Sequence, residues 1–209
     1  MYVQPSFAVD TETAHDLLAT MPFGHLITNN GRDFTVSGMP VIFDPTDGEF
    51  GVLRGHLARA NNQWKSCDPS SPALMLFAGA DGYISPNWYP SKHAHGKVVP
   101  TWNYTSVYVH GVITVHDDAR WVRMIVEALT ERHEADQNPP WSVDDAPANY
   151  IDAMLRAIVG IELQITRIDA KQKLSQNREG ADRDGAIDEL RCGSAAQQRL
   201  AVAMGATKQ

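Results

Sequence analysis

Cysteine is scarce in this chain, and long apolar runs are missing. Its 209 residues include 2 cysteines, Cys67 and Cys192, which are too few for a disulfide scaffold and fit a reducing cytoplasm. No apolar run approaches the roughly 18 residues that a membrane span needs. The opening residues, Met1-Tyr-Val-Gln-Pro5, also lack the charged-then-apolar pattern of a secretion signal. The sequence therefore predicts a cytoplasmic protein that does not cross a membrane.

Positive charge is also in short supply. The chain holds 18 Lys and Arg against 25 Asp and Glu, a formal net charge of −7. Residues 1–50 hold one basic and seven acidic side chains, and residues 105–166 hold four and ten, so each block carries −6. Binding to nucleic acid normally needs a basic face that neutralises phosphates, and no helix-turn-helix signature is legible. Direct DNA binding by one chain is therefore disfavoured.

The segment from residue 54 to residue 104 departs from this acidic background. It holds five Lys or Arg against two Asp or Glu, and it contains three of the five tryptophans, Trp64, Trp88 and Trp102. Such a segment suits a flat cofactor that carries a phosphate. The ring stacks on an aromatic face, its polar edge takes amides, and the phosphate takes cations or backbone N–H groups.

Short strands joined by tight turns dominate the predicted secondary structure. Strands are predicted over residues 23–28, 34–43, 49–54, 73–77, 103–115 and 160–168. Helices are predicted over residues 10–21, 58–66, 117–129 and 147–158. Asn29-Asn-Gly31 predicts a hairpin turn, and residues 85–100 are predicted to form a long ordered loop. Turn-linked strands at this spacing favour an antiparallel barrel or sandwich.

Five blocks of sequence carry a family likeness. They are Gly55-His-Leu-Ala-Arg-Ala-Asn61 with Trp64, Tyr83-Ile-Ser-Pro-Asn-Trp-Tyr89 with Lys92, Val99-Pro-Thr-Trp-Asn-Tyr104, Ile158-Val-Gly-Ile-Glu162 and Lys173-Leu-Ser-Gln-Asn-Arg178. In this order they resemble the PaiB-like family, described as FMN-binding negative transcriptional regulators. The resemblance implies a mainly β, α+β fold with peripheral helices: a split antiparallel β-barrel, as in pyridoxamine-phosphate-oxidase-like flavoproteins. It also implies a homodimer with flavin at the subunit interface.

The likeness covers roughly residues 1–190, which are predicted to form one FMN-binding split-barrel domain. Residues 191–209 are predicted to be a C-terminal tail, weakly helical or disordered. Two positions depart from the family's pattern. Val36-Ser-Gly-Met-Pro40 has Gly38 where the family commonly has a histidine, so a pocket that has lost flavin is one alternative. Asn62 replaces a proline, which we expect to matter little.

The phosphate of the flavin is assigned to residues around the end of the third predicted strand. Arg59 and Asn61, at the expected start of a helix, are predicted to hold the phosphate together with the free N–H groups of that helix end. Lys92 is predicted to add a second positive charge. His56 either points a nitrogen at the ligand or forms a hydrogen bond inside the barrel. The alternatives are a surface ion pair for Arg59, a turn for Asn61 and a solvated Lys92.

The ring is assigned to Trp102, Asn103 and Tyr104, which lie at the start of the long strand. Trp102 is predicted to stack on the isoalloxazine and Asn103 to hydrogen-bond its pyrimidine edge. The alternative for all three is packing in the core. Lys173 and Arg178 are candidates to reach across a dimer interface.

The predicted function is that of an FMN-binding homodimeric regulator, acting through redox sensing or a partner protein. A flavin-dependent oxidoreductase is one alternative, in which the flavin carries the chemistry and no catalytic residue is assigned. A haem-binding split barrel is another, with His56 or His110 as axial ligand. No metal site is predicted, because His93 and His95 lack a third ligand.

Overall fold

A computed structural model describes residues 1–66, 71–178 and 180–207. Cys67 lies outside these residues, so the pairing of the two cysteines is not described. Among the helices within these ranges, none is both long and apolar enough to cross a membrane.

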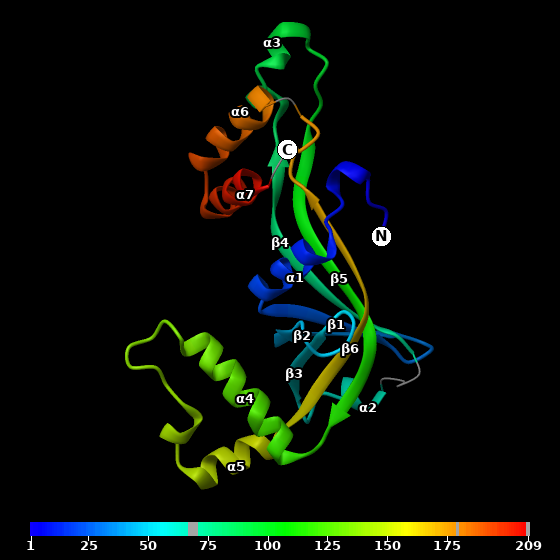
Figure 1. The fold of residues 1–209 in the computed structure, drawn as a ribbon, viewed down its shortest axis with the longest axis vertical. Coiled ribbons are helices and arrows are strands. Elements are labelled where there is room, and N and C mark those ends of the chain that lie inside the picture. The colour runs from blue at the N-terminus through cyan, green and yellow to red at the C-terminus, as the bar shows by residue number, and fades with distance from the viewer. Residues whose placement is uncertain (67–70, 179, 208–209) are drawn as a thin grey trace. The chain divides into compact units, whose positions relative to one another are not determined.

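In the described part of the chain, six strands close into a barrel in the order β1-β2-β3-β6-β5-β4 (Figure 1). The strands are β1 Phe23–Asn29, β2 Phe34–Asp44, β3 Val52–Ala58, β4 Ala73–Ile84, β5 Thr101–His116 and β6 Ile158–Lys173. The helices are η1 Pro5–Phe7, α1 Thr11–Thr20, α2 Gln63–Ser66, η2 Pro86–Trp88, α3 Ser91–His95, α4 Ala119–Glu134, η3 Val143–Asp145, α5 Ala148–Arg156, α6 Gly180–Arg191 and α7 Ala195–Ala206. The predicted antiparallel barrel with peripheral helices is confirmed.

The chain forms two compact units, and the three longest strands contribute to both. We call His15–Phe77 with Tyr108–Ile168 the barrel unit. We call Met1–Ala14, Ala78–Val107 and Asp169–Gln209 the terminal unit. The strands predicted over 73–77 and 160–168 are therefore too short, because each continues into the second unit.

The hairpin of β1 and β2 follows its local sequence. The two strands pair antiparallel, with Phe23 opposite Pro40 and Asn29 opposite Phe34. Gly31 has φ 85°, a left-handed conformation that glycine adopts without strain, and its N–H donates to Asn29 Oδ1 at 2.7 Å. The predicted turn is confirmed, and it fixes the register of the hairpin.

One face of α4 supplies the second layer of the barrel unit. Asp118 caps the helix by accepting the N–H groups of Arg120 and Trp121. Val122, Ile125 and Leu129 are buried at helical spacing, and the helix packs against β2, β3 and α5. Both long helices predicted after β5 are therefore confirmed, and α4 covers the outward side of β3.

The terminal unit has an apolar core of its own. Helices α6 and α7 lie side by side (Figure 1), and their cluster contains Ile84, Tyr89, Leu174, Ala186, Ile187, Leu190, Leu200, Ala201 and Met204. Ser194 caps α7 in a capping box with Gln197. The predicted weakly helical or disordered tail is thus, from Ala195 to Ala206, a packed helix. Small residues dominate this helix, which leaves little periodic signal in the sequence.

Two segments differ from the predicted elements. The helix predicted over 58–66 is wrong in its first half, because Ala58 pairs with Ile158 in the β3–β6 ladder and only residues 63–66 are helical. The predicted loop over 85–100 contains η2 and α3. In the first case, pairing with a strand far along the chain decides the local conformation.

Candidate functional site

Arg59 follows β3, and protein groups already engage its guanidinium. Nη1 and Nη2 donate to the Asp117 carboxylate at 3.0 and 2.5 Å, and Nε donates to the carbonyl of Arg156 at 2.7 Å. The bond to Asp117 raises the pKa of Arg59 and lowers the pKa of Asp117. Both side chains are exposed, so solvent screens the ion pair and its contribution to stability is small. A phosphate can therefore take the place of Asp117 at small cost.

Asn61 forms the turn that the alternative interpretation predicts. Its Oδ1 accepts the N–H of Gln63 at 2.9 Å, and its Nδ2 donates to Ser37 Oγ at 2.7 Å. Helix α2 has only four residues, so it lacks the aligned peptides that give a long helix its positive end. The side chain of Asn61 is thus a structural support in this conformation.

His56 lies on β3, opposite Gly160 on β6. Burial lowers the pKa of His56, so the imidazole is neutral at pH 7. Its Nδ1 is buried and has no hydrogen-bond partner among the described residues. The ring lines a cavity of about 340 Å³ together with Pro40, Leu129 and Trp141. The unpaired nitrogen is enclosed by protein atoms, so a ligand in the cavity would reach it only after a local rearrangement.

His110, the other predicted haem ligand, is engaged by the protein. Its Nε2 lies 2.9 Å from Nη2 of Arg167. Neutral His56 is therefore the better suited of the two to coordinate iron.

Trp102 and Tyr104 share one face of β5, and Asn103 points to the other. Trp102 is 52% exposed, and its indole N–H donates to Asp81 Oδ2 at 2.8 Å. Asn103 is 1% exposed, and its Nδ2 donates to Ser175 Oγ at 2.9 Å. The face of Trp102 is available for stacking, whereas Asn103 lies in the core of the terminal unit.

Two lysines of β6 lie beside this aromatic face, and Lys92 lies elsewhere in the same unit. Lys173 Nζ donates to the carbonyl of Trp102 at 2.7 Å and to Thr101 Oγ1. Lys171 Nζ lies 5.3 Å from the centre of the Tyr104 ring. Lys92, on α3, donates to the neutral side chain of Asn87 at 2.6 Å. The predicted cation Lys92 is therefore free of any carboxylate in the described part of the chain.

An imidazole that sequence reasoning missed lies opposite Gly38. The hairpin register pairs His25 with Gly38, so side chains at these positions project from the same face. A Cβ on Gly38 would come within 2.6 Å of the Phe23 ring, and that ring packs edge-on against His25 at 5.6 Å. The outer face of the hairpin thus carries a histidine from β1 in place of one from β2. Because the turn at Asn29–Gly31 fixes the register of the hairpin, it could have predicted that His25 lies opposite Gly38.

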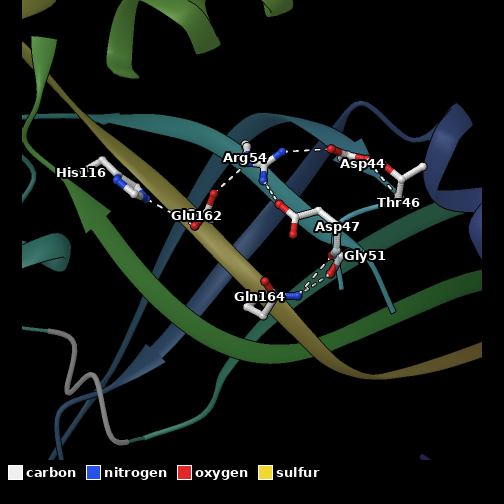
Figure 2. A network of polar contacts seen from close by, with 8 residues as sticks. All are labelled: Asp44, Thr46, Asp47, Gly51, Arg54, His116, Glu162 and Gln164. Atoms are coloured by element: carbon white, nitrogen blue, oxygen red, sulfur yellow. Dashed lines mark hydrogen bonds and ion pairs between the residues drawn. The ribbon is translucent and has the colours of Figure 1, made fainter. Parts of the chain in front are cut away.

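A polar network joins four strands of the barrel unit (Figure 2). Arg54 donates to Glu162 at 2.8 Å, to Asp44 at 3.1 Å and to Asp47. His116 Nε2 lies 3.4 Å from Glu162 Oε1. No group of three or more His, Cys, Asp or Glu is arranged to hold a metal ion in the described ranges. With Arg54 at its centre, the network links β2, β3 and β6 by ion pairs.

The seven predicted residues fall in different units. His56, Arg59 and Asn61 belong to the barrel unit, and Lys92, Trp102, Asn103 and Tyr104 belong to the terminal unit. Within the terminal unit, the structure brings together Trp102, Tyr104 and the two lysines of β6. Sequence reasoning assigned no cofactor contact to Lys171 or Lys173.

Sequence comparison supports a flavin-related family. Residues 1–167 match the sequence profile of a family described as "Putative FMN-binding domain". The chain is 28% identical over 191 residues to the Bacillus subtilis "Protease synthase and sporulation protein PAI 2", covering 91% of this chain and 89% of that protein. It is 35% identical over 182 residues to the uncharacterised Emericella nidulans protein AN0679, covering 72% of each. The resemblance to PaiB-like proteins is confirmed.

Structural comparison supports the fold. The FAD- and haem-binding protein of Mycobacterium smegmatis matches 87% of this chain with a TM-score of 0.58 and 16% sequence identity. The match covers 80% of that protein. The predicted flavin-type split barrel is confirmed.

Proposed function

Because this chain belongs to the FMN-binding domain family, we propose that it is a PaiB-like regulatory protein that binds FMN without a covalent bond. The observation that carries this proposal is the half-exposed ring of Trp102 beside Tyr104 and Lys173. These side chains match the two parts of FMN, a flat aromatic ring and a phosphate that carries about −2 charge. Bound FMN supplies electron-transfer chemistry, and the chain's own residues position it.

Each predicted residue then has a role that fits its contacts. Trp102 stacks on the ring, and Tyr104 borders it on the same face. Lys92 offers a cation, and Arg59 reaches a phosphate only by exchanging Asp117. His56 keeps a ligand-binding role because its Nδ1 is unpaired in the described structure. Asn61 and Asn103 hold the surrounding backbone and core.

The absorbance spectrum of freshly purified protein, followed by titration of the apoprotein with FMN, tests the proposal. We expect flavin bands at about one FMN per chain and quenched tryptophan fluorescence. A Soret band without flavin bands would instead favour the haem alternative, with His56 as the candidate ligand. If neither flavin bands nor a Soret band appeared, FMN binding would be refuted. Faster bleaching of bound flavin by NAD(P)H, relative to free FMN, would favour the oxidoreductase alternative.

Replacing Trp102 by alanine should weaken FMN binding about tenfold or more, since stacking on one aromatic side chain contributes about 1–3 kcal/mol. The measurement is a fluorescence titration of the variant and the wild type. Tyr150→Ala is the matched control, because Tyr150 is also a half-exposed aromatic residue at 55% but lies in the barrel unit, outside the cavity beside His56. Equal loss in both variants would contradict a stacking role for Trp102.

We also propose that two copies pack through the outer face of the β1–β2 hairpin. Phe23, Phe34 and Val36 are 53, 73 and 56% exposed, and the register places them on one face. Exposed apolar patches of this kind mark interaction surfaces. The family resemblance implies that the occupant is a second copy of this chain.

Light scattering after gel filtration should give twice the chain mass of 23.0 kDa. Val36→Asp should shift the protein toward the monomer, because it places a charge in the apolar contact. Val202→Asp, at a more exposed position on α7 (72% against 56% for Val36), should leave the dimer intact. A wild-type protein with the mass of one chain would refute the dimer.

We propose that regulation runs through bound flavin and a partner protein. The net charge of −7 opposes direct binding to the phosphate backbone of DNA. Gel shifts with the purified protein provide the test. Salt-sensitive and sequence-specific binding to DNA would overturn the indirect mechanism.

A further inference from the structure

Three cations at and just after the end of β6 make no contact with a carboxylate among the described residues. Lys171 and Lys173 lie at the end of β6, and Arg178 follows five residues later. In the described part of the chain their side chains meet backbone carbonyls, a hydroxyl and aromatic rings, but no carboxylate. Lys171 is only 9% exposed, and Lys173 is half-buried. Buried cations are normally paired, so this set is unusual.

The two lysines project from the same face of the sheet as the aromatic pair. Lys171 lies over the Tyr104 ring, so both side chains occupy one side of the neighbouring strands β5 and β6. Because side chains two residues apart on a strand point the same way, Trp102 and Lys173 share that side. The hydrogen bond from Lys173 to the carbonyl of Trp102 keeps the ammonium beside the exposed ring.

The cations are held close enough to disfavour one another. Burial lowers the pKa of Lys173, and the nearby charges of Lys171 and Arg178 add to that effect. Three carboxylates of this unit each have another contact. Asp182, whose charge acts on Tyr89 against that of Arg178, accepts the N–H and the hydroxyl of Ser91. Asp81 accepts the indole N–H of Trp102, and Asp169 pairs with the α-amino group of Met1 at 3.2 Å. Within residues 1–66, 71–178 and 180–207, the three cations therefore have no carboxylate contact, as a site for an anion requires.

We infer that Lys171, Lys173 and Arg178 hold the phosphate of FMN, while Trp102 stacks on its ring. The inference rests on the proposed binding of FMN and assigns the phosphate to residues other than Arg59. Charge favours this assignment. The guanidinium of Arg59 already pairs with the Asp117 carboxylate, whereas none of these three cations contacts a carboxylate in the part of the chain that the structure describes.

The experiment compares FMN with riboflavin, which has the same ring and no phosphate. The apoprotein is titrated with each flavin by fluorescence, for the wild type and for Lys173→Gln, Lys171→Gln and Arg178→Gln. We expect the wild type to prefer FMN. We expect Lys173→Gln to lower its affinity for FMN by about ten- to a hundredfold, the effect of one charged hydrogen bond, with riboflavin affinity unchanged. Added salt should weaken the binding of FMN more than that of riboflavin.

Matched variants separate charge from folding. Lys97→Gln removes an exposed lysine from the same unit and should leave the preference intact, and Lys173→Arg should retain most of it. Circular dichroism and thermal unfolding check that each variant folds. The inference is overturned if the wild type binds both flavins equally, or if Arg59→Gln abolishes the preference while Lys173→Gln preserves it. In both cases flavin binding itself stands. A wild type that binds neither flavin would refute the proposed function as well.

Discussion

Replacing Arg54 by methionine should lower the free energy of unfolding by about 3 kcal/mol at pH 7. Arg54 is 19% exposed and is the cation shared by Asp44, Asp47 and Glu162 (Figure 2). Its loss leaves three carboxylates close to one another without a counter-charge, on strands that the barrel holds together. Urea unfolding of the variant and the wild type measures the difference.

Arg123→Met is the control for this variant. Arg123 also contacts two carboxylates, those of Glu127 and Asp144, each at 2.6 Å. Its pairs are more exposed to solvent, which screens them, so their loss should cost much less than the loss of Arg54. Similar losses in the two variants would show that the network around Arg54 is no more than a set of surface ion pairs.

Acid should erase part of the difference between Arg54→Met and the wild type. Hydrogen bonds from Thr46, followed by Arg54, hold the pKa of Asp44 below its ordinary value of 3.8. A depressed pKa in the folded state stabilises the protein above the unfolded pKa, and this stabilisation is lost as the pH falls through the folded pKa. Repeating the urea unfolding below about pH 3.8 should therefore give a smaller difference than at pH 7. A constant difference would contradict this explanation.

Gly111→Ala should also destabilise the barrel strongly. A Cβ at this position would lie 2.3 Å from the backbone oxygen of Gln164 on β6 and 2.5 Å from Leu163 Cδ2. Because a backbone atom cannot rotate away, the strands must separate, at a cost of about 3 kcal/mol. Thermal or urea unfolding measures this cost.

Gly205→Ala provides the comparison, since a Cβ at that helical position meets no heavy atom within 4 Å. It should stabilise α7 by about 0.5 kcal/mol, because alanine has the higher helix propensity. If Gly111→Ala proved equally harmless, β5 and β6 would have to be more widely spaced than the structure places them.

Local patterns in the sequence predicted the hairpin and α4, but not the reach of the long strands. The turn at Asn29–Gly31 and the cap at Asp118 act on residues beside them. By contrast, β4 continues through Ala78-Gly-Ala-Asp-Gly82, a stretch with poor strand propensity. Its conformation depends on neighbouring strands that are distant in sequence. Helix propensity also predicted a helix beginning at residue 58, but Ala58 pairs with Ile158 of β6 instead.

The candidate site shows the same limits. Trp102, Asn103 and Tyr104 are consecutive on a strand, so they could not all face one ligand; the period of two was already visible in the sequence. The ion pair between Arg59 and Asp117 joins residues 58 positions apart, and no pattern in the sequence predicts it. Lys171 and Lys173 come close to Trp102 and Tyr104 only because β6 pairs with β5, and the sequence alone does not predict that pairing.

The order of synthesis matters for a protein built in this way. Ala8 forms a β-bridge with Lys171, and the terminal unit draws on three separate stretches of chain. During translation the first residues must therefore wait until almost the whole chain has left the ribosome. Contacts so distant in sequence slow folding and leave apolar surface exposed meanwhile. The terminal unit, with its aromatic and cationic face, is consequently the last part of the nascent protein that can be completed.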